Sequence, residues 1–383
     1  MTVTTAKGFL ASGIAAGIKV SGNADLALIQ NIGPIRNSAV VFTSNRAKAN
    51  PILWSMEVAK GGVTEAIVLN SGGANCFTGE IGFQITHATA EAVAEALDVS
   101  AAKVLVCSTG LIGDQLPKEK LLAGVKSAAG LLTDSGGPDA ARAIMTTDTV
   151  PKTAEFHANG WSIGGMAKGA GMLAPGLATM LVVITTDANL SSAELDDALK
   201  FAVKRSFNRL DSDGCMSTND QVTLMASGAS GITPSAAEFG DALAALCLDL
   251  AMQLMNDAEG ASHNIAISVS GAASEDDAEE VARSVARNNL FKAAVFGNDP
   301  NWGRILAAIG TTQAAFDPYQ VDVTINGVRV CRAGGPDRPR DEVDMTPRDT
   351  NIGIELFNGA HSATVWSNDL THDYVEENSA YSS

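Results

Sequence analysis

The chain has 383 residues, of which 46% are hydrophobic and 18% are charged, and its formal net charge is -17. That length predicts two domains or one large layered fold, and no apolar run reaches the roughly 20 residues that a membrane-spanning helix needs. A large acidic excess repels polyphosphate and anionic lipid. The composition therefore argues against nucleic acid and membranes as partners.

The N-terminus and the cysteines indicate the compartment. The first residues lack the apolar block of an export signal, and the 5 cysteines are odd in number and form no CxxC pair. We therefore expect a cytoplasmic protein whose cysteines are buried thiols. The 5 histidines show none of the spacings of known metal motifs, so no metal site is predicted.

Short β-rich runs alternate irregularly with longer helical patterns, which predicts a mixed α/β fold. In chain order, the expected elements are strands at 39–44 and 65–70, a helix at 86–97, strands at 103–108 and 179–186, a helix at 192–210, a strand at 221–227, a helix at 235–260, a strand at 264–271 and a helix at 276–290. The Asn326-Gly327 pair within 321–331 predicts a hairpin, and a hairpin demands antiparallel pairing. The polar stretch 332–349 is interpreted as a surface loop.

The absence of established catalytic motifs argues against several enzyme classes. The sequence has no GxGxxG, no GxxxxGK[ST] and no GxSxG, so a dehydrogenase, a P-loop enzyme and an α/β-hydrolase all lose support. An SxxK match at 100–103 lacks the motifs that accompany it in its own enzyme class and is attributed to chance.

Thr179 stands where a run of glycines and small residues passes into an apolar β-rich stretch. A threonine hydroxyl is a poor nucleophile unless a base takes its proton, and one known arrangement uses the threonine's own α-amino group. That amine exists only if the bond between Ala178 and Thr179 is cut, and the preceding glycines permit the strained turn that such a cut needs. The alternative is that Thr179 only begins a strand.

Three more places carry residues suited to acyl transfer. Thr109 and Gly110 follow an apolar strand and supply donors for an oxyanion, unless they only form a turn. Lys168 is flanked by glycines and suits an anionic substrate group, with a surface position as the alternative. Glu259 lies where a helix is expected to end, so its carboxylate opposes the helix macrodipole and is either a ligand or a solvated side chain.

Two polar turns present the same choice. Residues 70–75, NSGGAN, are read either as part of a site or as a turn, and residues 296–304, FGNDPNWGR, are interpreted as a capped corner.

Taken together, these segments resemble the ornithine acetyltransferase family, the autoprocessing enzymes of arginine biosynthesis. The agreement runs in order along almost the whole chain, through KGFLASGIAAGIK, NSGGAN, VCSTGLIG, AIMTTDT, GGMAKGAGMLAP, LATML, LDSDG, STND, DAEG, DPNWGR and YVEENSAYSS. The resemblance implies a layered α/β/β/α sandwich of the N-terminal-nucleophile type. It also implies cleavage between Ala178 and Thr179 into an α chain, 1–178, and a β chain, 179–383, which stay associated as two copies of each.

The resemblance further implies the chemistry. Thr179 takes the acetyl group of N2-acetylornithine, releases ornithine, and carries the acetyl group as an ester until L-glutamate accepts it. Thr109 and Gly110 would stabilise the oxyanion, Lys168 suits a carboxylate and Glu259 suits the ornithine ammonium. The implied substrate contacts are Thr146, Lys168, Thr179, Glu259, Asn378 and Ser383. No cofactor is implied, and acetyl-CoA is left open as a second acetyl donor.

The sequence departs from the family pattern at Cys76, Gly176, Gln221 and Ser262-His263, where Thr-Lys is usual for the last pair. These departures bear on substrate affinity and cleavage rate more than on reaction type. Two other functions stay open. One is a hydrolase of related architecture, in which water or a peptide amine replaces glutamate, and the other is an uncleaved acidic protein that binds amino acids.

Overall fold

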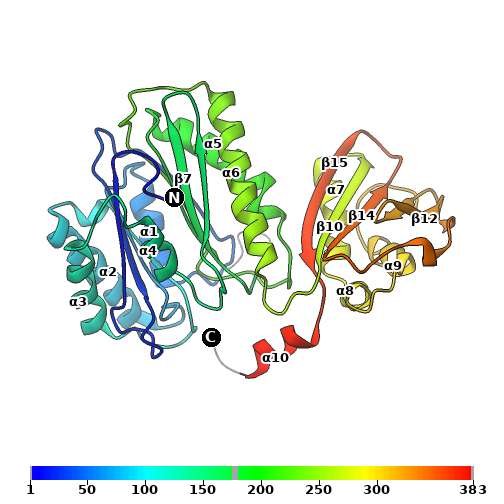
Figure 1. Cartoon of the computed structure of the whole chain (residues 1–383), viewed down its shortest axis with the longest axis horizontal. Helices are drawn as coiled ribbons and strands as arrows, with labels where there is room; N and C mark the ends of the chain where they lie inside the picture. Colours follow the sequence, from blue (N-terminus) through cyan, green and yellow to red (C-terminus); the bar gives the residue numbers. More distant parts are fainter. Residues whose placement is uncertain (1, 175–179, 381–383) are drawn as a thin grey trace.

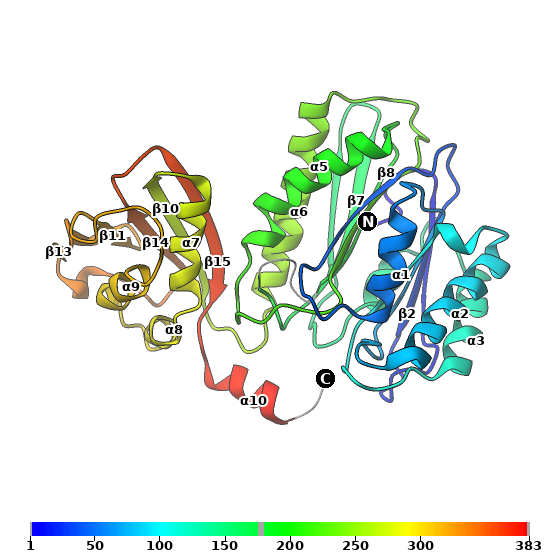
Figure 2. The ribbon, with the colours of Figure 1, turned by 180° about the vertical axis from the view of Figure 1, so that it is seen from behind.

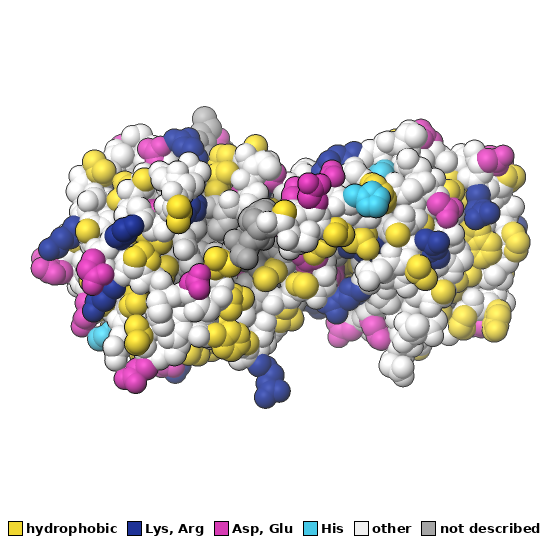
Figure 3. Space-filling view, turned by 90° about the horizontal axis from the view of Figure 1, so that it is seen from below, with side chains coloured by type: hydrophobic (Ala, Val, Ile, Leu, Met, Phe, Trp, Pro, Cys, Tyr) yellow, Lys and Arg dark blue, Asp and Glu magenta, His cyan; other side chains and the backbone are white. Residues whose placement is uncertain are grey.

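Three sheets organise the computed structural model, which describes residues 2–174 and 180–380. Their strand orders are β1-β2-β4-β5, β3-β9-β8-β7-β6 and β13-β12-β11-β14-β10-β15. The first two sheets pack into one lobe and the third forms a second lobe (Figure 1). The face drawn in Figure 3 shows a narrow waist between the lobes, with acidic and basic side chains scattered over both.

The first lobe is built from two sheets, each covered by helices on its outer face. The first sheet comprises β1 (Phe9–Ile14), β2 (Leu26–Asn31), β4 (Ala66–Asn70) and β5 (Val104–Ser108), and carries α2 (Gly79–Leu97) and α3 (Lys118–Ala129). The second comprises β3 (Ser38–Phe42), β6 (Lys152–His157), β7 (Ser162–Lys168), β8 (Leu181–Thr186) and β9 (Gln221–Ala226), and carries α5 (Ser192–Arg205) and α6 (Ala236–Asn256). Two shorter helices, α1 (Asn50–Ala59) and α4 (Gly137–Ala143), pack on the strands.

The inner faces of these two sheets pack against each other. Strand β2 shows why, because alternate residues of a strand point to opposite faces. Leu26 and Leu28 belong to the core shared with α2 and α3, whereas Ala27 and Ile29 belong to the core shared with the second sheet, where they join Val183 of β8. The layers are therefore helices, sheet, sheet and helices (Figures 1 and 2), which confirms the predicted α/β/β/α sandwich.

Strand β8 is the central strand of the second sheet, and its start lies next to Lys168. Leu181 pairs with Lys168 of antiparallel β7 and with Gln221 of parallel β9. The predicted strand 179–186 is confirmed from Leu181 onward. Ala178, Thr179 and Gly176 lie outside the described residues. Because β7 and β8 are hydrogen-bonded neighbours, residues 1–178 and 179–383 share this sheet.

The second lobe has a core of its own, which the sequence reading does not separate from the first. Its strands are β10 (Asn264–Ala272), β11 (Asp322–Ile325), β12 (Val328–Arg332), β13 (Gly335–Pro336), β14 (Asp349–Glu355) and β15 (His361–Asn368), and its helices are α7 (Glu275–Ala286), α8 (Asn289–Phe296) and α9 (Trp302–Ile309). The predicted hairpin is confirmed, with φ angles of 45° at Asn326 and 82° at Gly327. After β15, helix α10 (His372–Ala380) runs back beneath the first lobe (Figure 1).

Several predicted boundaries are wrong by a turn or more. The helix expected at 192–210 ends at Arg205 and is followed by the 3-10 helix η2 (Phe207–Arg209), and the helix expected at 235–260 ends at Asn256. The pattern at 276–290 covers parts of two helices, because the Asn288 side chain accepts a hydrogen bond from the Phe291 N–H and begins a new one. The SxxK match lies in the 3-10 helix η1 (Ala101–Lys103), and the loop at 332–349 contains β13 and η3 (Arg340–Glu342).

Within the described ranges, no helix has both the length and the apolar character needed to cross a membrane.

Candidate active site

Six of the predicted site residues line one pocket of about 350 Å³: Thr109, Gly110, Thr146, Lys168, Glu259 and Asn378. They come from separate segments of the chain. Thr109 and Gly110 follow β5, Lys168 ends β7, and Asn378 lies in α10. The other predicted residues, Ala178, Thr179 and Ser383, lie outside the described residues. The first described residue after the proposed cut, Met180, leads directly into β8 next to Lys168.

The Thr109-Gly110 pair is held by the turn at 70–75. The Thr109 N–H donates to the Asn70 carbonyl, and the Thr109 carbonyl accepts from the Gly73 N–H, both at 2.9 Å. Gly110 has a φ of 127°, and a Cβ there would lie 2.7 Å from the Gly73 nitrogen, so this position requires glycine. Within the described chain, no acceptor takes the Gly110 N–H. A free backbone donor is therefore available at the pocket.

Lys168 is 2% exposed, so the surface reading of this residue is wrong. Its ammonium donates to Thr109 Oγ1 at 3.1 Å. That contact occupies a lone pair of the hydroxyl and leaves its proton available, and no described residue accepts it. Burial and Lys152 lower the pKa of Lys168, although Asp148, Asp220 and Glu259 oppose the shift.

Asp148 forms the buried support beneath the lysine. It accepts hydrogen bonds from the Gly169 N–H at 2.7 Å and the Thr146 N–H at 2.9 Å, and it pairs with the fully buried Lys152. Burial alone would raise the pKa of Asp148, but Lys168, Lys152 and these hydrogen bonds outweigh it and lower the pKa. An ionised carboxylate thus fixes the backbone on both sides of the pocket. The sequence reading misses this residue, although it lies within the AIMTTDT segment.

Glu259 and Asn378 form a polar pair in the wall of the same pocket. The Asn378 Nδ2 donates to Glu259 Oε2 at 3.0 Å, and the Glu259 N–H donates to the Ala170 carbonyl at 3.0 Å. A Cβ on Gly171 would lie 2.5 Å from Glu259 Oε2, so the carboxylate rests directly on a glycine. The macrodipole argument for Glu259 is wrong, because α6 already ends at Asn256.

Two acidic residues of the pocket region were not singled out from the sequence. Asp220 Oδ1 accepts the Met180 N–H at 2.9 Å, and Asp220 Oδ2 has no partner in the described chain. Burial raises the pKa of Asp220 well above its ordinary value. Burial also raises the pKa of Asp213, which accepts the Met172 and Cys215 N–H groups. Burial therefore disfavours the ionised form of both acids relative to an exposed carboxylate.

Cys215 also lines the pocket and is exposed, so the expectation that all cysteines are buried is wrong at this position. The other four cysteines are buried and all five are free. Among the described residues, no cluster of three or more His, Cys, Asp or Glu side chains is arranged to hold a metal ion.

The comparisons with known proteins cover the whole of this arrangement. The model of the ArgJ family matches residues 10–383. This chain belongs to the ArgJ family. Two full-length relatives are the arginine biosynthesis bifunctional protein ArgJ of Streptomyces avermitilis, 62% identical over 383 residues, and that of Thermobifida fusca, 56% identical over 382, each matched over 100% of both chains. The resemblance found in the sequence is thereby confirmed.

Solved structures of ArgJ relatives cover about half of the chain. An ornithine acetyltransferase complexed with ornithine, from Mycobacterium tuberculosis, is 53% identical with a TM-score of 0.45, covering 47% of this chain and 96% of that one. The arginine biosynthesis bifunctional protein of Bacillus halodurans is 35% identical with a TM-score of 0.49, covering 51% and 97%.

The departures from the ArgJ pattern fall in three kinds of environment. Cys76 is packed in a small core with Ala49 and Ile52. Gln221, at the start of β9, donates to Thr223 Oγ1 at 2.9 Å, and its Oε1 has no partner in the described chain. His263 Nδ1 lies 2.8 Å from Asp369 Oδ2. Gly176 lies outside the described residues.

Proposed function

We propose that this ArgJ-family protein is a glutamate N-acetyltransferase that moves the acetyl group of N2-acetylornithine to L-glutamate in arginine biosynthesis. The observation that carries the proposal is the convergence of Thr109, Gly110, Lys168 and the Glu259-Asn378 pair in one pocket beside the start of β8. Oxyanion donors, a cation and an anion in one pocket suit an acylated amino acid that carries both a carboxylate and an ammonium. The names of the full-length relatives support a role in arginine biosynthesis.

The nucleophile of this proposal is Thr179, freed by cleavage after Ala178. Support comes from the sheet around it, because the pairing of β7 with β8 runs from Ile163–Thr186 to Lys168–Leu181. Such a ladder holds residues 1–178 and 179–383 together after the bond between them is cut. We propose an assembly of two copies of each fragment.

In the first half-reaction, the α-amine of Thr179 takes the proton of its own hydroxyl, and the oxygen attacks the acetyl carbonyl carbon. The Thr109 hydroxyl and the Gly110 N–H donate to the resulting oxyanion. When the carbonyl re-forms, the amide C–N bond breaks and the ornithine nitrogen takes the proton from the Thr179 ammonium. The products are ornithine and an acetyl ester on Thr179. Lys168 holds the substrate carboxylate, and Glu259 with Asn378 holds the side-chain ammonium.

In the second half-reaction, the amine of glutamate attacks the ester carbonyl, and the same two donors stabilise the oxyanion. Collapse breaks the ester C–O bond, and the proton of the glutamate nitrogen passes through the α-amine to the Thr179 oxygen. The products are N-acetylglutamate and the free enzyme. Atoms balance without a cofactor, and acetyl-CoA enters as a second donor in place of acetylornithine.

The test combines mass spectrometry with two acetyl-transfer assays. The mature protein should show two fragments, the smaller starting at Met1 and the larger at Thr179, and it should make N-acetylglutamate from acetylornithine and glutamate. Thr179→Ala should stay uncleaved and inactive, whereas the matched variant Thr179→Ser, which keeps a hydroxyl, should cleave and transfer. An intact, active chain contradicts the proposal. Labelled acetyl groups that appear as free acetate indicate the hydrolase instead.

A second assay, with acetyl-CoA and glutamate, tests the additional donor, for which the word bifunctional in the relatives' names is the support. We also propose a cytoplasmic location, supported by five free cysteines.

A further inference from the structure

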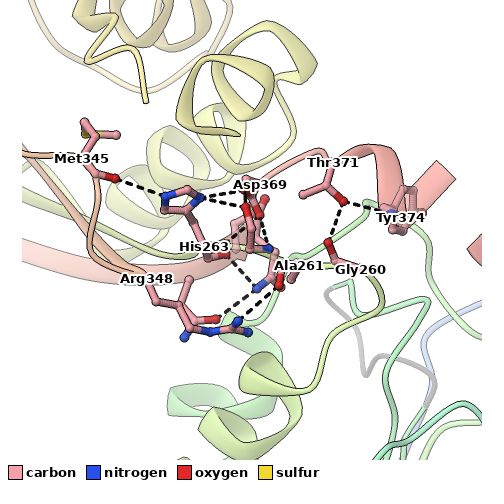
Figure 4. A network of polar contacts seen from close by, with 12 residues as sticks. Gly260, Ala261, His263, Met345, Arg348, Asp369, Thr371 and Tyr374 are labelled. Atoms are coloured by element: carbon pink, nitrogen blue, oxygen red, sulfur yellow. Dashed lines mark hydrogen bonds and ion pairs between the residues drawn. The ribbon is translucent and has the colours of Figure 1, made fainter. Parts of the chain in front are cut away.

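A polar cluster lies at the base of the second lobe, where β10 begins and β15 ends, outside the pocket walls (Figure 4). Asp369, just after β15, accepts hydrogen bonds at Oδ1 from the Ser262 and His263 N–H groups, at 3.0 and 2.9 Å. At Oδ2 it accepts from the Ser262 hydroxyl and pairs with His263 Nδ1 at 2.8 Å. We call Ser262, His263 and Asp369 the junction clasp. It ties the end of the last strand to the segment between α6 and β10.

His263 has an acceptor at each ring nitrogen. Nδ1 faces the Asp369 carboxylate, and Nε2 lies 3.2 Å from the Met345 carbonyl oxygen, with the side chain largely buried. Nδ1 also lies 3.1 Å from the Ser262 hydroxyl. The Asp369 carboxylate therefore contacts the His263 ring and accepts three further hydrogen bonds from Ser262 and His263.

The clasp is connected to the pocket through the neighbouring turn. Thr371 Oγ1 donates to the Gly260 carbonyl at 2.6 Å and accepts the Tyr374 N–H at 2.9 Å, which caps the start of α10. Gly260 has a φ of 58°, and a Cβ there would lie 2.2 Å from the Tyr374 nitrogen. The turn before the clasp and the first turn of α10 are thus in direct contact. Figure 4 shows Gly260, Thr371 and Tyr374 beside one another.

These connections end at the two residues of the pocket wall. Glu259 immediately precedes Gly260, and Asn378 lies one helical turn beyond Tyr374, whose carbonyl accepts from Asn378 Nδ2 at 3.0 Å. Arg348 adds a strap from the second lobe, since its guanidinium donates to the carbonyls of Asn256 and Ala261. A shift of the clasp would move Glu259 relative to Asn378 and lengthen the 3.0 Å bond between them.

We propose that His263 and Asp369 are positioning residues that fix the Glu259-Asn378 pair for the side-chain ammonium of the acylated substrate. This inference rests on the proposed function and extends it to a determinant of substrate specificity in the second lobe. Without the clasp, the carboxylate loses its fixed place and binds the ammonium less well, while the oxyanion donors of the first lobe stay in place. Substrate affinity falls, and the chemical step is retained.

The test compares acetylornithine with N-acetylnorvaline, which has the same carbon chain but no side-chain ammonium. For His263→Ala we expect KM for acetylornithine to rise about tenfold with kcat within about threefold of wild type, the pattern of lost binding rather than lost transition-state stabilisation. With N-acetylnorvaline, wild type and His263→Ala should have equal kcat/KM. Asp369→Asn should behave like His263→Ala.

Three controls separate positioning from folding. His263→Lys keeps a side-chain nitrogen that donates to Asp369 and should restore KM to within about threefold of wild type. His361→Ala removes an exposed histidine of β15 and should change nothing. Thermal unfolding of every variant shows whether it folds. If His263→Ala does not fold, the comparison of His263→Lys with His263→Gln, two variants that differ in charge, takes its place.

The outcomes are distinct. An unchanged KM for acetylornithine in folded His263→Ala, or equal losses with acetylornithine and N-acetylnorvaline, overturns the positioning role and leaves the proposed function standing. A wild-type enzyme that fails to transfer acetyl from acetylornithine to glutamate overturns both.

Discussion

Thr109→Val offers a sharp test of the site, because valine keeps the shape of threonine and removes only the hydroxyl. In the structure, Lys168 Nζ donates to Thr109 Oγ1 at 3.1 Å, so the hydroxyl proton is available for the oxyanion. Loss of one such donor costs about 10²–10³ in kcat, or about 2.7–4 kcal/mol of transition-state stabilisation. The Gly110 N–H stays in place, so transfer should be slow rather than absent.

The same substitution should also weaken folding, since the buried Lys168 ammonium loses an acceptor. Leaving a buried donor unsatisfied costs about 1–3 kcal/mol of unfolding free energy. The assay is acetyl transfer from acetylornithine to glutamate, normalised to the cleaved fraction on a denaturing gel, together with urea unfolding. Thr109→Ser keeps the hydroxyl and should stay within about tenfold of wild type. A cleaved Thr109→Val enzyme whose kcat is within about threefold of wild type would refute the oxyanion role.

Three more outcomes are expected. Gly110 has a φ of 127° and a Cβ there would lie 2.7 Å from Gly73, so Gly110→Ala should lose about 1–3 kcal/mol of unfolding free energy and most activity. The control Gly22→Ala, at a φ of 76° with open space around it, should lose less unfolding free energy and remain active. Urea unfolding and transfer rates would show both effects. Asp148→Asn should cost about 3–5 kcal/mol of unfolding free energy, because it breaks a buried ion pair. Asp148 raises the pKa of Lys168, so in this variant the alkaline loss of activity should begin at lower pH than in wild type. An unchanged pH–rate profile would contradict this prediction. Partial burial and the carboxylates of Asp213 and Asp211 raise the pKa of Cys215, so iodoacetamide should modify this thiol slowly at neutral pH and faster as pH rises. Ornithine should protect Cys215, and peptide mass spectrometry would detect the adduct. Modification that ornithine does not slow would place the thiol away from the bound substrate.

The local signals of the sequence anticipated several strands and turns in both lobes. Apolar runs such as Ala66–Asn70 and Leu181–Thr186 fill buried strands, and the Asn326-Gly327 turn encodes its hairpin because both residues tolerate positive φ. The corner at 296–304 is confirmed as a cap, since the Asn301 side chain accepts from the Arg304 N–H. Ordered motifs along the whole chain also sufficed to identify the family.

The sequence by itself determined several of the strands, the turn chemistry and the residue types available for acyl transfer, because these follow from spacing and local backbone preference. The family resemblance had grouped Thr109, Lys168, Glu259 and Asn378 at one site, but only the tertiary structure decided how these polar groups contact one another. It buried Lys168 against Thr109, placed Asp148 beneath it, and brought Asn378 to Glu259 through a clasp between segments more than 100 residues apart in sequence. Such contacts depend on how the sheets and lobes pack, and a one-dimensional pattern carries no record of that packing.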